Sequence, residues 1–264
     1  TPQPSNEVTQ NVSGLKTNTT YYWKVKVDDG NGGITESATY NFTTVVVASG
    51  WSTAPSMSNE RHWAASAVYG DFLYVFGGAG LPPYNKVEKF DFIPSKWITL
   101  NVMPVSKFLI RAATVGNYIY VFGGYSSNNV YRYNPAVDSW TQLNDMPTCE
   151  WMGDPAVVQG KIYIIGCKRF PSGADGKVLE YNPSNDSWTV KTPMPTARYA
   201  PATAVYNNKI YVLGGNYGTK KNEVYDPATN SWDARADVIF SNYGWGVAGT
   251  IGNKIYFVDS DNSP

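Results

Sequence analysis

The chain has 264 residues, of which 42% are hydrophobic and 16% charged, and its 21 basic residues balance its 21 acidic ones. This composition excludes a disordered chain and a coiled coil, and the even charge balance without a basic stripe argues against a nucleic-acid partner. No run of 18 apolar residues is present, so no membrane segment is expected, and residues 1–10 lack the pattern of a signal peptide. Short apolar runs between turn residues predict an all-β protein.

The first fifty residues predict strands with one buried face. Tyr21, Trp23, Val25 and Val27 stand at every second position, the sequence DDGNGG then predicts a hairpin turn, and the alternation resumes at 38–42. Leu, Thr and Tyr within 15–21 have the spacing of a tyrosine corner. This stretch resembles the last strands of a fibronectin type III domain, with Thr17 where that family prefers Pro.

Such a sandwich needs about 100 residues, and fewer than 50 precede the next pattern. We therefore expect three parts: a partial fibronectin type III-like sandwich at 1–44, a linker at 45–50, and the repeats at 51–264. The incomplete sandwich suggests that the chain is a window from a longer secreted protein.

From residue 51 onward one pattern recurs about every 45 residues. Most copies contain a Trp, a Met six residues later, a small-residue strand, an apolar strand ending in glycine, and a turn of aromatic, Asn or Asp, and Pro. The apolar strands read LYVFGG at 73–78, IYVFGG at 119–124, IYIIGC at 162–167, IYVLGG at 210–215 and IYFVDS at 255–260. The repeat tryptophans are Trp51, Trp97, Trp140, Trp188 and Trp232.

This pattern resembles the kelch repeat over residues 51–258. The resemblance implies a β-propeller in which each repeat forms one four-stranded blade. A strand between two blades is covered on both faces, which agrees with the uninterrupted apolar runs. The small residues at 112–114 and 202–204 suit an innermost strand around a narrow channel, and the repeat tryptophans are expected to pack from the outer strands.

Four repeats are complete, and the fifth stops after its second strand. We expect an incomplete kelch-type propeller whose own fifth blade does not seal the ring. Kelch propellers commonly close when one terminus completes the blade of the other, and Trp51 begins an outer strand, but a third strand is still missing. The remainder of a longer polypeptide or another chain is expected to complete the propeller.

The single histidine, His62, limits the chemistry. Kelch copper-radical oxidases need two His, a zinc site needs more ligands than one His and two Cys, and no nucleophile elbow accompanies His62. No catalytic residue, metal or cofactor is therefore expected. The Asp and Asn residues at 28–31 and 259–262 suit turns better than a calcium loop.

Two kinds of covalent modification are considered. Four sequons could carry glycans in an exported protein, although chance explains them better in a chain this rich in Asn, Ser and Thr: Asn11, Asn18, Asn41 and Asn185. Cys149 and Cys167 lie at the two ends of one predicted hairpin, about three positions out of register. We predict that they form a disulfide; the alternative is a pair of buried thiols.

The loops at the start of the inner strands hold the candidate ligand-binding residues. Aligned on the repeat tyrosines, one column contains Arg61, Lys107, Glu150, Arg198 and Tyr243, and the next contains His62, Phe108, Trp151, Tyr199 and Gly244. The loops after the apolar strands end at the same face and add Tyr84, Tyr125, Arg169, Phe170 and Tyr217. Rings with charged groups between them suit sugars or peptides, whereas the alternative for each Arg is that it only bonds nearby loop carbonyls.

The expected function is that of an extracellular or cell-surface binding or adhesion module whose loop face takes a carbohydrate or protein ligand. The alternative is a carbohydrate-active enzyme, because kelch sialic-acid mutarotases need only acid and base side chains on that face. Glu150 with Arg61 or Arg198 could serve there. No spacing singles out such a pair, so an enzyme is the less favoured of the two expectations.

Overall fold

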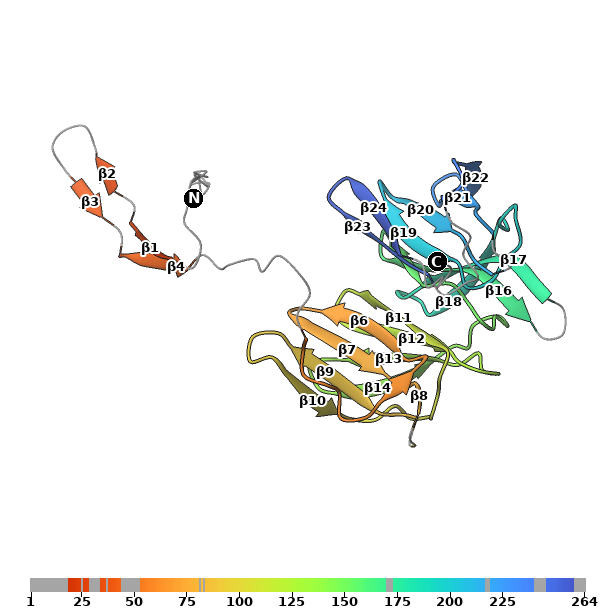
Figure 1. Ribbon diagram of the computed structural model, residues 1–264, viewed down its shortest axis with the longest axis horizontal. Helices are drawn as coiled ribbons and strands as arrows, with labels where there is room; N and C mark the ends of the chain where they lie inside the picture. The colour runs from red at the N-terminus through yellow and green to blue at the C-terminus, as the bar shows by residue number, and fades with distance from the viewer. Residues whose placement is uncertain are drawn as a thin grey trace. The chain divides into compact units, whose positions relative to one another are not determined.

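Figure 1 shows a computed structural model of the chain, which describes residues 19–24, 26–28, 34–36, 38–43, 53–80, 82, 84–169, 173–216, 219–239 and 246–258. The chain divides into two units, Thr1–Ala54 and Pro55–Pro264, and each is treated by itself. All regular elements of the described residues are strands. No helix in this part of the chain is long and apolar enough to cross a membrane.

The described part of the first unit contains two antiparallel strand pairs. β1 (Thr20–Trp23) pairs with β4 (Tyr40–Thr43), and β2 (Lys26–Asp28) pairs with β3 (Ile34–Glu36). Tyr21 lies opposite Phe42 and is half-buried, while the neighbouring Tyr22 is 70% exposed, so the predicted alternation is present in β1. The fibronectin type III assignment stays a prediction.

Among the described residues, the second unit contains four four-stranded antiparallel sheets and two two-stranded ones (Figure 1). The first blade contains β6 (Ala65–Tyr69), β7 (Phe72–Phe76), β9 (Val87–Asp91) and β10 (Lys96–Leu100). The second contains β11 (Ile110–Val115), β12 (Tyr118–Gly123), β13 (Val130–Asn134) and β14 (Ser139–Leu143). The third contains β15 (Ala156–Val158), β16 (Lys161–Arg169), β17 (Gly173–Asn182) and β18 (Ser187–Lys191).

The fourth blade contains β19 (Ala202–Tyr206), β20 (Lys209–Leu213), β21 (Asn222–Asp226) and β22 (Ser231–Ala234). The fifth has only β23 (Val247–Ile251) and β24 (Lys254–Val258) among the described residues, and a short pair, β5 (Arg61–His62) with β8 (Ala79–Gly80), extends the first blade. The all-β architecture with four full repeats and part of a fifth is therefore as predicted.

The core lies between the blades, because a second strand that has a blade on either side is covered on both faces. In β12, Tyr120 and Phe122 pack against the third blade, while Ile119 and Val121 pack against the first. All four are at most 3% exposed. This two-sided burial explains why the second strands have uninterrupted apolar runs instead of alternation.

The glycine pairs that end the second strands allow close backbone approach. At Gly77, φ is 54° and a Cβ atom would lie 2.5 Å from the carbonyl oxygen of Lys107 in the next repeat. Any larger residue there is excluded by that contact and strained by the positive φ. The glycines therefore let the loop of one blade lie directly on the strand end of its neighbour.

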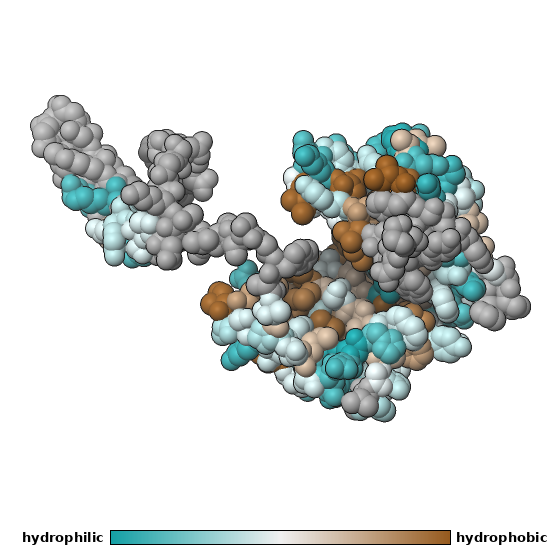
Figure 2. All heavy atoms as spheres, viewed as in Figure 1, coloured by the Kyte–Doolittle hydropathy of each residue, from teal (hydrophilic) through white to brown (hydrophobic). Residues whose placement is uncertain are grey.

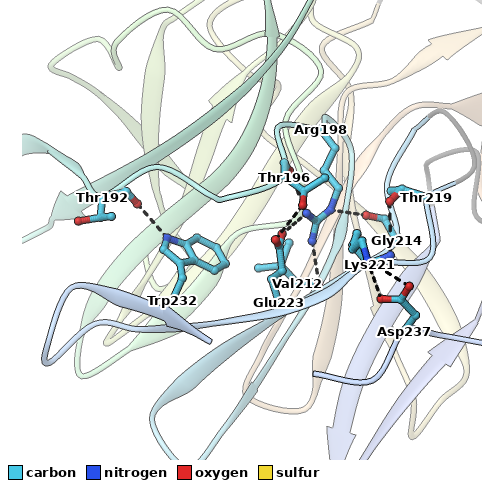
Figure 3. Close-up of polar contacts among 10 residues, drawn as sticks. All are labelled: Thr192, Thr196, Arg198, Val212, Gly214, Thr219, Lys221, Glu223, Trp232 and Asp237. Carbon is cyan, nitrogen blue, oxygen red and sulfur yellow. Dashed lines mark hydrogen bonds and ion pairs between the residues drawn. The ribbon is translucent and has the colours of Figure 1, made fainter. Parts of the chain in front are cut away.

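Each of the four repeat tryptophans that the structure describes lies on an outermost strand, where it is half-buried, and links its blade to the preceding repeat (Figure 3 shows Trp232). Its indole N–H donates to the carbonyl of the residue four positions after the preceding repeat tryptophan. The four bonds are Trp97 to Pro55 (2.8 Å), Trp140 to Asn101 (3.2 Å), Trp188 to Asn144 (3.3 Å) and Trp232 to Thr192 (3.0 Å). The tryptophans are thus structural, as the sequence predicts.

In the second, third and fourth blades a second link joins the turn before the outer strand to the segment of the preceding repeat that accepts the indole bond. The Tyr133 hydroxyl donates to Asp138 (2.6 Å), and the Asp138 carboxylate accepts the backbone N–H of Asn101 in the previous repeat (3.0 Å). Tyr181 with Asp186 and Tyr225 with Asn230 repeat the arrangement in the next two blades. Asp138 has φ of 49°, a conformation that Asp and Asn tolerate better than most residues.

Candidate binding site

The arginines expected at the rim lie inside the blades. Arg198 is 1% exposed and forms an ion pair with Glu223, and its guanidinium also donates to the carbonyls of Thr196, Val212 and Gly214 (Figure 3). Arg61 repeats the arrangement with Glu88 and the carbonyls of Gly77 and Lys86. The structure therefore corrects the expectation that these arginines face a ligand: a buried guanidinium bonds the nearby strand and loop carbonyls.

Lys107 occupies the same position in the second blade and is 7% exposed. Its ammonium donates to the carbonyl of Gly123 and the hydroxyl of Ser127, both at 2.7 Å, and lies 5.5 Å from the ring centre of Tyr131. Burial lowers the pKa of Lys107 to about 8, although Asp145 opposes that shift. The Lys107 ammonium thus also bonds groups within its own blade, and it does not face a ligand as the sequence analysis expects.

In the third blade this position holds Cys149, one place earlier than the sequence alignment expects. Cys149 and Cys167 are joined by a disulfide with a Cα–Cα distance of 5.1 Å. The antiparallel pairing of Glu150 with Lys168 leaves the two cysteines two positions out of register, one fewer than the sequence predicts, and β16 has a bulge between Ile165 and Cys167 where it pairs with β17. Glu150 therefore corresponds to His62, Phe108 and Tyr199, not to the buried cations.

The rim of the first two blades carries an exposed cluster of rings, here called the first ring cluster. It contains His62, Trp63, Phe108 and Tyr125. Phe108 stacks between Trp63 (centroids 5.9 Å apart, planes at 28°) and Tyr125 (5.4 Å, 12°), and His62 meets Trp63 edge-on at 4.5 Å. Trp63 is 50% exposed and Tyr125 59%. Large rings at this exposure on a rigid scaffold are typical of a binding surface.

The rim of the next two blades carries the second ring cluster, Trp151, Tyr199 and Lys168. The rings of Trp151 and Tyr199 meet edge-on at 5.8 Å. The Lys168 ammonium lies 5.1 Å from the first ring centre and 5.0 Å from the second, which is cation–π distance. Trp151 and Tyr199 therefore lie together, and the cation beside both rings is Lys168.

A channel of about 330 Å³ is lined mainly by small residues, among them Ala64 and Ala200, which follow Trp63 and Tyr199 in the chain. Its polar feature is an ion pair between the Arg111 guanidinium and the Asp154 carboxylate, 2.9 Å apart, with the Asp154 side chain 40% exposed. Enclosure in the channel raises the pKa of Asp154, and the positive charge of Arg111 partly opposes that rise. The pair places one donor group and one acceptor group in a confined space.

Sequence analysis missed this pair, although a signal for it exists. The strand register puts Arg111 and Asp154 at the position that Ala65 and Ala202 hold in the first and fourth blades. Opposite charges in adjacent blades, at a position that otherwise holds Ala, mark an ion pair. The extra residue before β15 hid the correspondence.

The remaining expected residues have mixed placements. Phe108 and Trp151 are half-buried and His62 is exposed, Arg169 ends β16, and Tyr243 lies outside the described residues. Asn41 and Asn185 are exposed, while Asn11 and Asn18 lie outside the described ranges. Within those ranges no group of three or more His, Cys, Asp or Glu side chains is arranged to hold a metal ion.

Comparison with known proteins agrees with this architecture. The sequence matches the family profile of the KLHDC2/KLHL20/DRC7 kelch-repeats domain over residues 27–215 and that of the kelch motif over residues 197–237. A solved structure described as "Structure of YjhT" matches with a TM-score of 0.64 and 20% identity, covering 77% of this chain and 74% of that one. At that identity the likeness shows the fold alone. No curated protein matches the sequence.

Proposed function

Because the chain belongs to the KLHDC2/KLHL20/DRC7 kelch-repeats family, we propose that it is a binding module whose ligand is a protein or carbohydrate held on the two ring clusters. The observation that carries the proposal is the exposure of Trp63 and Tyr125 on a rim where Lys107 and Arg198 are buried. These rings have no core to fill, so their large apolar area is available to a ligand.

The two classes of ligand use these rings differently. A sugar stacks on the exposed outer face of Trp63 or Tyr125, whereas a polypeptide also offers carbonyls to the polar groups of the rim. Lys168 adds a positive charge between two rings of the second cluster, which favours a ligand with an anionic or carbonyl oxygen.

We also propose an extracellular or cell-surface location. The Cys149–Cys167 disulfide supports this proposal, because such bonds persist in oxidising compartments and are rare in the cytosol. Detection of two reactive thiols in protein taken from its native source without reductant would contradict this location.

The test of the binding proposal begins with a glycan array and a displayed peptide library, followed by calorimetry with the strongest hit. Replacing Trp63 or Trp151 by Ala should weaken binding about tenfold or more, which corresponds to roughly 1.4 kcal/mol or more. Phe92→Ala is the matched control, because Phe92 is 58% exposed on the turn before β10. Equal affinity in all of these variants would place the ligand elsewhere.

The Arg111–Asp154 pair favours a second candidate, a carbohydrate-active enzyme. A carboxyl group with a raised pKa beside a guanidinium in a small cavity is an arrangement that acid–base catalysis uses. Turnover of an array hit that Asp154→Asn abolishes, while the hit still binds, would favour this candidate. Binding without turnover in the unmodified protein would exclude catalysis on that ligand.

A further inference from the structure

The second ring cluster has the form of an aromatic cage around a cation. The rings of Trp151 and Tyr199 stand nearly at right angles, at 89°, and the Lys168 ammonium lies 5.1 Å from the first ring centre and 5.0 Å from the second. Aromatic walls around one ammonium are the arrangement by which proteins recognise quaternary ammonium ligands. In this cluster a lysine of the chain itself occupies the place of such a ligand.

The two walls are fixed by the backbone. Trp151 has φ of 48°, in the left-handed region that a bulky residue rarely adopts, and its carbonyl accepts the N–H of Ala200 at 3.1 Å. Tyr199 is held by the buried Asn216. The Asn216 side-chain oxygen accepts the Tyr199 N–H (3.2 Å), and the Asn216 N–H donates to the Tyr199 carbonyl (3.0 Å). The backbone of both rings is therefore held independently of the cation between them.

The occupant, in contrast, is carried by a flexible side chain that water reaches. Lys168 is half-buried, as are Trp151 and Tyr199, and Figure 2 shows hydrophilic residues on the surface where β16 and β17 lie. A primary ammonium is strongly hydrated, so it loses little free energy when it leaves the rings for water. A trimethylammonium group has methyl groups in place of N–H donors, so it is less hydrated and gains more from the same two rings.

The charges beside the rings favour a ligand with both signs of charge. Glu150 and Lys168 exchange two backbone hydrogen bonds, at 3.1 and 2.8 Å, so their side chains leave the same face of this strand pair. The disulfide between Cys149 and Cys167 joins the residues that precede them and fixes the pair. A carboxylate and a displaced lysine beside two rings match a cation and an anion joined by a short linker.

We propose that the second ring cluster binds a phosphocholine-type zwitterion. Its quaternary ammonium lies between Trp151 and Tyr199, and its anionic oxygen accepts hydrogen bonds from the displaced Lys168 ammonium. This inference rests on the proposed function, because it takes the second ring cluster as a ligand surface, and it names the chemistry of the ligand. The oxygen that Lys168 favours and the cation that the rings favour are then two ends of one molecule.

Calorimetric titration of the whole chain with phosphocholine tests the rings. We expect saturable binding that Trp151→Ala weakens about tenfold. Trp63→Ala is the matched control and should bind phosphocholine like the unmodified protein, because Trp63 holds the same repeat position with φ of 56° but belongs to the first ring cluster. Phosphoethanolamine, whose ammonium carries no methyl groups, should bind about tenfold more weakly than phosphocholine.

Lys168→Met tests the exchange of cations. The variant removes both the internal occupant and the partner of the anion, while it keeps most of the apolar stem. Choline, which has no anion, should bind this variant about tenfold more tightly than it binds the unmodified protein, because no cation has to be displaced. Phosphocholine should bind the unmodified protein more tightly than choline does, and Lys168→Met should abolish that preference.

Vesicles of phosphatidylcholine distinguish two sources of the same chemical group. Sedimentation of the chain with these vesicles would identify a lipid head group as the ligand. Binding of free phosphocholine without sedimentation would identify a soluble or polymer-linked ligand. Both results support the proposed chemistry of the site.

Three results would overturn the proposal. The first is no saturable binding of phosphocholine to a protein whose melting curve is cooperative. The second is equal affinity of Trp151→Ala and Trp63→Ala for phosphocholine. The third is an unchanged affinity of Lys168→Met for choline, and this comparison decides alone if Trp151→Ala proves unstable. A glycan or peptide hit that Trp63→Ala weakens would uphold the proposed function even if the zwitterion did not bind.

Discussion

At one repeated position the four blades bury Arg, Lys, Cys and Arg, and each of the three cations has a matching partner on the third strand of its blade. The first and fourth blades pair Arg with Glu, and the second pairs Lys107 with the ring of Tyr131. The third has the disulfide, and the corresponding strand position there holds Leu179. A cation is thus buried only where the opposite strand offers it a carboxylate or a ring.

Arg198→Ala should destabilise the protein by about 3–5 kcal/mol, because it leaves the Glu223 carboxylate buried without its partner. The double variant Arg198→Met with Glu223→Leu should recover most of that loss, since the third blade already tolerates an apolar residue at the Glu223 position. Urea unfolding measures both variants. A double variant as unstable as Arg198→Ala would show that the guanidinium bonds to carbonyls matter more than the charge pair.

Lys107 should make stability depend on pH. Because the pKa of Lys107 is about 8 in the folded protein and 10.5 is its ordinary value, the unfolded chain binds more protons between these two pH values. The free energy of unfolding therefore gains a contribution that rises with pH across this range. Relative to Lys107→Met, the unmodified protein should gain about 1–3 kcal/mol, measured by urea unfolding at each pH. Parallel pH profiles for the two proteins would contradict this prediction.

At the scale of the element, the turn between the third and fourth strands carries the contact between blades. The Tyr133 hydroxyl orients the Asp138 carboxylate, which caps Asn101 in the previous repeat, and the carbonyl of Asn101 accepts the Trp140 indole. The first blade has Phe90 and Ser95 in place of Tyr and Asp, so its turn lacks this tyrosine hydroxyl bond.

Tyr133→Phe tests this turn because it removes one hydroxyl from a residue that is fully buried. The loss should be about 1–2 kcal/mol, since Asp138 keeps its backbone partner but loses the phenol. The thermal melting curve reports the loss, and Tyr22→Phe is the control, because Tyr22 is 70% exposed. Equal melting temperatures for Tyr133→Phe and the unmodified protein would show that the hydroxyl contributes nothing.

Sequence periodicity predicted the strands, their order and the outer position of the tryptophans, because those features depend on residue type at a fixed spacing. The site was less predictable. Arg198 and Trp151 belong to different repeats but to neighbouring columns of the repeat alignment. Only the structure shows that the Arg198 side chain is inside its blade and that Trp151 is on the rim. The third repeat has one residue fewer before Cys149 and one more before Ala156, which the alignment on tyrosines could not resolve.

At the scale of the whole molecule, the place of a blade in the series decides how much a residue of that blade contributes to the stability of the fold. Phe122 and Val258 occupy the same repeat position, but Phe122 is covered by the third blade and Val258 is 62% exposed. Repeat proteins behave in this way because each unit is stabilised mainly by its neighbours.

Replacing each of these two residues by Lys should therefore give different results. Phe122→Lys should cost more than about 4 kcal/mol, because it buries an unpaired charge, whereas Val258→Lys should stay within about 0.5 kcal/mol of the unmodified protein. Urea unfolding followed by tryptophan fluorescence measures both. A large loss for Val258→Lys would mean that its face is covered in solution.

Some of these contacts lie within one blade and others join two blades, and this difference bears on how such a chain could arise by duplication of a repeat. The Arg–Glu ion pairs, the Lys–Tyr contact and the Cys–Cys disulfide each lie within a single repeat. One repeat could therefore change its pair without a matching change in the neighbouring repeats. The tyrosine hydroxyl bonds the acid or amide of its own turn, and that acid or amide and the tryptophan then bond the preceding repeat, in the same form at three successive junctions. A whole blade could therefore replace another and keep its bonds to the adjacent blades. An exchanged segment that ended between the first and third strands would instead separate the two members of a buried pair.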